Sequence, residues 1–321
     1  MPPAGKTGWP WTTPFSDTSS LHTSYASLIT SHSSRSEFPR VSLVMPCLNA
    51  SPYIEEALRS LLLQGYPDLE LMVFDGGSTD GTVEIIKRYA SWLAYWVSEK
   101  DRGQSHAINK GLEKVTGEWF NWFNADDVMC VGSVKAMVEM GLTNRNCVGV
   151  CGSMLNFEED GKESIARPVP GNKEQLGNWV DPYFLPQPSS LYATNLCRRV
   201  GGVNEKLYYT MDMELVLKLA DLGEFAVVDR VITRFRCHEK SKTTHCYYGG
   251  LLEMLVTNFN FGQVQVAEEM LRRRMDGHAR LVIGMLNDED VAKMVDGWGY
   301  AKVARYLIRR LWKNILLRVS L

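Results

Sequence analysis

The pair Asp126-Asp127 follows the apolar segment 118–125 and is the strongest candidate for chemistry in this sequence. A segment so rich in aromatic residues is typical of a buried strand, and two adjacent ionised carboxylates are costly to bury. We therefore expect the pair at the tip of the strand, where a divalent cation would neutralise it. Mg²⁺ and Mn²⁺ prefer oxygen ligands, usually one or two carboxylates together with substrate phosphates. A metal–diphosphate site is the favoured interpretation, and a solvated acidic loop is the alternative.

Other polar residues in the first half have the types needed to bind a nucleotide. Asp75 is followed by two glycines, so its carboxylate can accept a hydrogen bond from a base N–H while the backbone approaches closely. Four more polar residues begin a predicted helix, where the helix terminus and a cation favour phosphate. They are Arg102, Gln104, Asn109 and Lys110. An ordinary polar surface is the alternative for each of these residues alone.

The order of the predicted elements explains how these residues would meet. Strands are expected at 41–45 (ended by Pro46), 69–74, 93–97 and 118–125, and helices at 51–64 (capped by Ser51-Pro52), 83–89, 103–115 and 134–140. Alternating strands and helices predict an α/β fold, with a mostly parallel sheet covered by helices on both faces. Ligands of such sheets bind at the carboxyl ends of the strands, which is where the candidate residues fall.

The second half of the chain is less regular. We expect a strand at 148–155, a hairpin at Asp160-Gly161 and a Pro-rich segment carrying Trp179, Tyr183 and Phe184. The pattern then predicts helices at 194–200 and 211–222, the latter capped by Thr210, strands at 225–228 and 231–235, and helical structure from 247 onward.

Four segments carry a family resemblance when they are taken in order: 44–49, 73–81, 101–111 and 124–127. Together they resemble the nucleotide-sugar-binding half of the family 2 glycosyltransferases, which have the GT-A fold. The resemblance extends over residues 40–243. It implies an inverting, metal-assisted transfer of a sugar from a nucleoside-diphosphate sugar to a hydroxyl of a glycan or lipid-linked acceptor. UDP is the expected nucleotide, with GDP and dTDP left open.

The resemblance also assigns roles around the donor. It gives Asp75 the base-binding role, with Pro46 and Asn49 shaping its surroundings. It makes Asp127 the ligand of Mn²⁺ or Mg²⁺ and Asp126 a ribose or donor contact. The metal would bridge the diphosphate and improve it as a leaving group.

Two further assignments concern catalysis. The segment 210–215 resembles the one that supplies the general base, which favours Asp212, with Glu214 as second choice or positioning residue. Acids in a first helical turn also offset the helix dipole, which is the alternative reading. His238 begins a His-x-x-Ser-x-Ser/Thr pattern that, in relatives, closes over the diphosphate or joins the metal; a structural histidine is equally compatible.

Composition and the pattern of apolar segments argue against several other classes of protein. The net charge of −2 argues against a nucleic-acid binder, and 45% hydrophobic residues suffice for a real core. No apolar stretch reaches the length of a membrane span, residues 1–36 lack the apolar region of a signal peptide, and the scattered cysteines suggest reduced thiols. We therefore expect a cytoplasmic protein.

We divide the chain into three regions. Residues 1–38 form a Ser/Thr/Pro-rich arm that packs locally through Trp9 and Trp11, residues 39–245 form the catalytic domain (donor half 39–130, acceptor half 131–245), and residues 246–321 form a helical extension. Residues 297–321 contain no acid and six bases interleaved with apolar residues. This pattern suits a helix on an anionic membrane surface, such as the cytoplasmic face, or one packed on the domain.

Other functions are less consistent with the sequence. A sugar-nucleotide pyrophosphorylase has a related sheet but would carry a Gly-rich basic loop after the first strand. A dehydrogenase would show GxGxxG there. A non-catalytic nucleotide-binding scaffold of the same fold is the remaining alternative, although the base-binding, metal and catalytic acids are all present.

Overall fold

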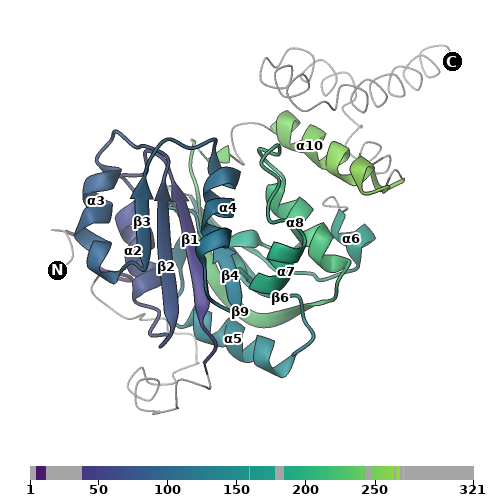
Figure 1. Ribbon diagram of the computed structural model, residues 1–321, viewed down its shortest axis with the longest axis horizontal. Helices are drawn as coiled ribbons and strands as arrows, with labels where there is room; N and C mark the ends of the chain where they lie inside the picture. Colours follow the sequence, from purple (N-terminus) through teal and green to yellow (C-terminus); the bar gives the residue numbers. More distant parts are fainter. Residues whose placement is uncertain are drawn as a thin grey trace.

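The computed structural model describes residues 5–11, 38–158, 160–177, 184–239, 241–242, 247–263, 265–267 and 270. These residues build three layers, with one mixed sheet between two layers of helices (Figure 1). The strands are β1 (Val41–Cys47), β2 (Leu69–Asp75), β3 (Tyr95–Ser98), β4 (Trp119–Trp122), β5 (Val128–Met129), β6 (Gly149–Glu158), β7 (Glu163–Ala166), β8 (Ser190–Ala193) and β9 (Phe225–Cys237). The helices are α2 (Ile54–Leu62), α3 (Thr82–Tyr89), η2 (Ala90–Trp92), α4 (Gln104–Lys114), α5 (Ser133–Thr143), α6 (Lys173–Gly177), η3 (Gln187–Ser189), α7 (Thr194–Arg199), α8 (Met211–Ala220) and α10 (Tyr247–Asn260).

The strands follow the order β3-β2-β1-β4-β8-β6-β9-β5, with β7 paired to β6. The first four strands of this order are parallel, whereas β8 is antiparallel to both of its neighbours. In the parallel part, Cys47 pairs with Asp75 and Asp75 pairs with Ser98, so three strands end at the same level. The loops that follow them therefore emerge side by side at one edge of the sheet.

Side-chain alternation along β1 explains the two helical layers. Leu43 and Met45 point toward a core shared with α2, α3 and α5, while Val44 points toward a core shared with α4, α7 and α8. Both faces of β1 are buried, which is why its sequence is apolar apart from Ser42 rather than alternating. The expected α/β class, a sheet covered by helices on both faces (Figure 1), is thus confirmed.

Three local predictions were wrong. β1 continues through Pro46, because its pairing with β4 ends at Val44 and the missing N–H of the proline leaves no β4 bond unmade. Helix α2 begins at Ile54 without a side-chain cap, and the backbone N–H of Ser51 instead donates to Asp80 Oδ2 at 2.9 Å. The predicted strands at 225–228 and 231–235 form the single strand β9.

The N-terminal residues 5–11 pack on the domain through their tryptophans, as expected. Trp9 Nε1 donates to the backbone oxygen of Met129 at 3.0 Å. The guanidinium of Arg59 lies 5.1 Å from the ring of Trp11, and this ring is buried.

Several predictions fall on residues outside the described ranges. They concern Trp179, Tyr183, Thr243 and the segment 297–321. Among the helices of the described residues, none combines the length and apolarity that a membrane crossing requires.

Candidate active site

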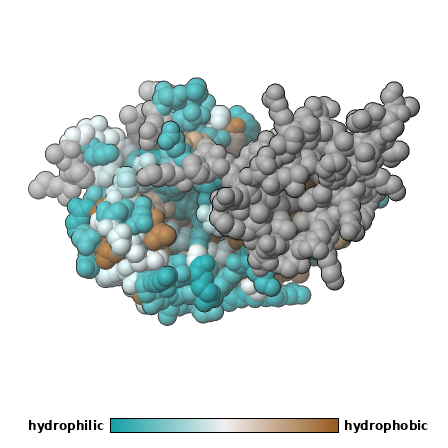
Figure 2. All heavy atoms as spheres, turned by 90° about the horizontal axis from the view of Figure 1, so that it is seen from above, coloured by the Kyte–Doolittle hydropathy of each residue, from teal (hydrophilic) through white to brown (hydrophobic). Residues whose placement is uncertain are grey.

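The loops after β1 and β2 are joined to each other at the carboxyl edge of the sheet. Asn49 has a left-handed backbone (φ 50°), which its short amide side chain tolerates. Its Oδ1 accepts from Thr79 N at 3.0 Å, and its own N–H donates to Ser78 Oγ at 2.7 Å. These bonds hold the residues that the sequence placed around a nucleotide base. Figure 2 views the molecule from above, the side of these strand ends, where the described surface is mainly hydrophilic.

The carboxylate of Asp75 lies at the centre of these loops and is only 2% exposed. It accepts from the backbone N–H groups of Gly77 and Ser78 at 3.1 and 2.9 Å, and from the hydroxyls of Ser78 and Ser98. Burial alone would raise the pKa of Asp75, but the bonds from Ser78, Ser98 and Gly77 outweigh burial and lower it below 3.8. Asp75 is therefore an ionised acceptor that organises the loop.

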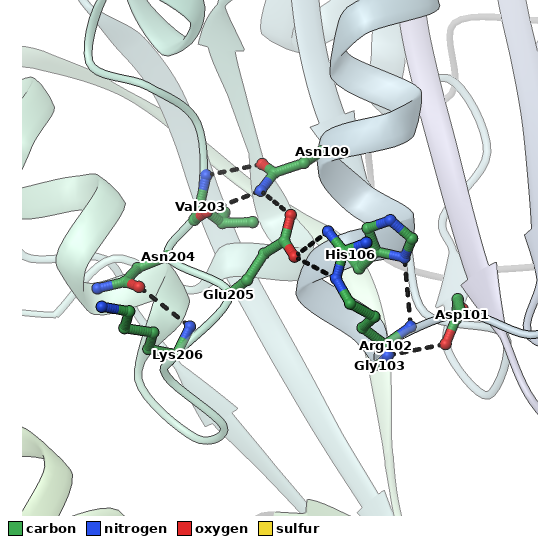
Figure 3. A network of polar contacts seen from close by, with 9 residues as sticks. All are labelled: Asp101, Arg102, Gly103, His106, Asn109, Val203, Asn204, Glu205 and Lys206. Atoms are coloured by element: carbon green, nitrogen blue, oxygen red, sulfur yellow. Dashed lines mark hydrogen bonds and ion pairs between the residues drawn. The ribbon is translucent and has the colours of Figure 1, made fainter. Parts of the chain in front are cut away.

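The helix-start residues predicted to bind phosphate are largely engaged within the protein (Figure 3). The guanidinium of Arg102 pairs with Glu205 at 2.7 Å. The amide of Asn109 forms two bonds with the backbone of Val203, accepting from its N–H at 3.0 Å and donating to its oxygen at 2.9 Å. Lys110 pairs with Glu99 and lies over the ring of Phe74. Arg102 and Lys110 place positive charge at the edge, whereas Asn109 fastens the segment that precedes α8.

The acid pair divides into a buried and an accessible carboxylate. Asp127 is fully buried; its oxygens accept from Asn124 Nδ2 at 3.3 Å and from Arg236 N at 3.2 Å. Burial, and then the charge of Asp126, raise the pKa of Asp127 well above 3.8. Asp126 is partly exposed, and its Oδ2 lies 3.0 Å from His238 Nε2. The structure thus brings Asp126 and His238 together and turns Asp127 inward.

A chain of hydrogen bonds links the loop of the acid pair to Lys242, which lies on the segment after β9. Gln104 donates to Asn124 Oδ1 at 2.8 Å and accepts from Lys242 Nζ at 2.7 Å. Burial lowers the pKa of Lys242 to about 8, although the charges of Glu253 and Asp212 oppose this shift.

Asp212 lies in the first turn of α8 and is partly exposed. Its Oδ1 accepts from the N–H of Met213 at 2.8 Å. Its pKa is raised to about 6, because burial and, to a smaller extent, the charge of Glu253 outweigh the N–H bonds and the charge of Lys242, which lower it. Glu214, the second choice, accepts from Asn204 at 3.0 Å and pairs with Lys218 at 2.8 Å. The pKa of Asp212 is the one expected of a general base.

Three important residues were not singled out from the sequence. Arg236 binds the backbone oxygen of Asp126 at 3.0 Å and the carboxylate of Glu56 at 2.8 Å, which braces the acid pair. Lys242 joins Gln104 to the surroundings of Asp212, and Glu253 holds the start of α8. Only Glu253 carried a signal, because it is one acid within an apolar helical run.

Comparison with known proteins gives the class of this fold and site. The sequence profile of glycosyl transferase family 2 matches residues 42–189. This match, which covers just under half of the chain, supports a glycosyltransferase of this family with the GT-A fold, as the sequence motifs suggested.

The relatives are distant but match most of the chain. An uncharacterised glycosyltransferase of Rickettsia typhi is 25% identical over 87% of this chain and 86% of its own length. Among solved structures, a fragment of TarS from S. aureus in complex with UDP-GlcNAc has a TM-score of 0.56 at 19% identity, covering 80% of this chain and 79% of the fragment. A mannosyltransferase of Pyrobaculum calidifontis in complex with GDP-Man and Mn²⁺ has a TM-score of 0.53 at 20% identity, covering 87% of each chain.

Proposed function

We propose that this glycosyltransferase transfers a sugar, with inversion, from a UDP-linked donor to a hydroxyl of a glycan or lipid-linked acceptor. The observation that carries this proposal is the arrangement at one sheet edge. The ionised Asp75 carboxylate and the Asp126–His238 pair lie at this edge, and Lys242 connects Gln104 to the surroundings of Asp212, whose pKa is about 6. The nucleotide-sugar complexes of the two similar structures support the same donor class.

In this proposal the nucleotide end of the donor lies over the loops after β1 and β2. Asp75, Pro46 and Asn49 shape the base site, and a base N–H replaces one of the two hydroxyl donors, of Ser78 or Ser98, that the Asp75 carboxylate now holds. Arg102, Lys110 and Gln104 flank the phosphates, and the two cations exchange their present carboxylate partners, Glu205 and Glu99, for phosphate oxygens when the donor binds.

The accessible pair Asp126 and His238 fits a divalent cation. Asp126 and His238 would hold the ion, because a carboxylate oxygen and an imidazole nitrogen are suitable ligands of Mn²⁺. A bound Mn²⁺ or Mg²⁺ supplies charge that offsets the diphosphate leaving group. Asp127, the ligand expected from the family resemblance, is the weaker candidate because its oxygens face Asn124 and the backbone of Arg236. It lies buried behind the pair.

Asp212 accepts the proton of the acceptor hydroxyl. As the oxygen forms its bond to the anomeric carbon, the bond from that carbon to the diphosphate oxygen breaks, and the proton moves to the carboxylate of Asp212. A pKa of about 6 leaves this carboxyl ionised at neutral pH and more basic than an ordinary aspartate. Glu214 remains a positioning residue through Asn204.

The test combines donor binding with transfer. The protein is mixed with Mn²⁺ and a panel of nucleotide sugars, and thermal stabilisation and slow donor hydrolysis are recorded. Asp212→Asn should retain metal-dependent stabilisation by the donor and lose most transfer. Asp221→Asn, at the opposite end of α8 and paired with Lys173, is the matched control with normal transfer. Unchanged transfer by Asp212→Asn removes the assigned base.

The same panel addresses the alternatives. A binding scaffold would be stabilised by a donor without releasing a nucleoside diphosphate under any condition. A pyrophosphorylase would release nucleoside triphosphate when given pyrophosphate. Membrane contact through residues 297–321 remains a proposal, and pelleting with anionic liposomes, with and without this segment, tests it.

A further inference from the structure

Glu253 is a carboxylate buried where a charge is not expected. It lies in the middle of α10, between the apolar residues Leu251 and Met254, and it is 0% exposed. An ionised carboxylate in such a place is stable only when its oxygens are fully hydrogen-bonded. Its partners therefore indicate what the burial achieves.

The partners are three consecutive backbone N–H groups. Glu253 accepts from Tyr208, Tyr209 and Thr210 at 2.7, 2.6 and 2.7 Å, and from the hydroxyl of Thr210 at 3.1 Å. Thr210 occupies the N-cap position of α8 but makes no capping bond through its own side chain. The carboxylate of α10 thus fixes the segment that leads into α8 (Figure 1), a task usually left to local side chains.

We propose that Glu253 is the positioning residue of the catalytic base, fixing residues 208–210 and thereby the location and charge environment of Asp212. This inference rests on the proposed function of Asp212. Asp212 follows the fixed segment by two residues, so a shift of that segment moves its carboxylate directly. Small displacements of a reacting group are expensive in catalysis.

The charges around Asp212 make this role distinct from a purely structural one. Glu253 faces it from α10, Lys242 from the segment after β9, and the phenol of Tyr192 from β8. Glu214, on the same helix, is neutralised by Lys218. Burial raises the pKa of Asp212 first, Glu253 adds to this, and Lys242 opposes it. Removing the charge of Glu253 should therefore lower the pKa of Asp212.

The test is Glu253→Gln in the full chain, assayed with the donor and acceptor that the panel identifies. Glutamine has one acceptor oxygen and a donor amide, so it cannot serve three N–H groups. We expect kcat to fall about tenfold or more, a donor KM within about twofold of wild type, and an acid limb of the pH–rate profile at lower pH. Glu253→Asp, which keeps the charge, should return the acid limb toward its original pH.

A matched control lies one turn further along α10. Thr257→Val removes only a weak contact with the hydroxyl of Thr210 (3.4 Å) and should leave kcat and the pH profile unchanged. The inference is overturned if Glu253→Gln keeps the wild-type kcat and acid limb. It is also overturned if both Glu253 variants lose metal-dependent stabilisation by the donor, because the residue then serves folding alone.

The outcome separates this inference from the proposed function. If Asp212→Asn transfers normally, the proposed base is wrong, whatever Glu253 does. If Asp212→Asn is inactive while Glu253→Gln behaves as wild type, the assignment of Asp212 as general base is retained and the positioning role of Glu253 is wrong.

Discussion

Replacing Asp212 by asparagine should stabilise the folded protein at neutral pH while it removes transfer. The fold raises the pKa of this carboxyl from 3.8 to about 6, so the native state disfavours its charged form. A shift of roughly two units corresponds to an upper limit of about 3 kcal/mol. Asp212 keeps some solvent exposure, which reduces the expected gain in the free energy of unfolding to about 1–3 kcal/mol. Asparagine keeps an oxygen for the N–H of Met213, so no bond to that group is lost.

The pH dependence of this gain has a definite sign. Because the folded pKa lies above the unfolded one, the stabilising contribution of the carboxyl is fully present below pH 3.8 and is lost as pH rises through about 6. The Asp212→Asn variant has no carboxyl at this position, so its free energy of unfolding does not fall in this way as pH rises. The difference between variant and wild type should therefore be small near pH 4.5, grow through pH 6 and level off by pH 7.5, as measured by urea unfolding.

Two results would refute this reasoning. One is a variant less stable than wild type at pH 7.5, and the other is a gain that is equally large at pH 4.5. Asp221→Asn serves as the control, because that carboxylate is exposed and paired with Lys173. Its effect should stay within about 0.5 kcal/mol at every pH.

Three further predictions concern the scaffold and the metal. Gly111→Ala would place a Cβ 2.5 Å from both methyls of Val44. The free energy of unfolding should therefore fall by about 1–3 kcal/mol in urea titration, although alanine has the better helix propensity. A gain in stability would contradict this packing. Gly202→Ala adds a Cβ at φ +69° and 2.5 Å from Asn109 Oδ1, so it should cost about 1–3 kcal/mol in the same assay, and an unchanged midpoint would count against the observed loop. His238→Ala should raise the Mn²⁺ concentration for half-maximal transfer by about 10–100-fold while transfer at saturating metal partly recovers; an unchanged metal titration would remove His238 from the site.

The first half of the fold was predictable because its physical signals are local. Apolar strands buried on both faces, such as β1, alternate with helices that end at glycines, and this order leads to a parallel sheet. The second half was harder. Asp229-Arg230 reads as a turn between two strands, yet β9 continues through it, because β6 changes register on either side of Ser153 and keeps pairing. Gly152 allows this close approach, since a Cβ there would lie 2.4 Å from Ile232.

Residue types at the site were predictable, but their partners were not. Arg102 and Asn109 look like phosphate and donor contacts in the sequence, whereas the structure engages them with Glu205 and Val203, about a hundred positions away. A polar side chain at a helix start satisfies many partners equally well, and only the tertiary fold selects one. The same holds for Arg236, whose strand position gave no indication that it braces the acid pair.

The choice between Asp212 and Glu214 shows what tertiary structure adds to a motif. Both acids lie in the first turn of α8, where either offsets the helix dipole, so sequence position does not separate them. Lys218 lies one turn after Glu214 and is held at 2.8 Å from its carboxylate, so this carboxylate is already engaged in an ion pair. Asp212 instead combines burial with the nearby charge of Glu253, which comes from a helix beyond the segment matched by the family profile. Part of the basicity that the reaction needs therefore comes from α10, and variants of α10 should alter catalysis without touching any motif residue.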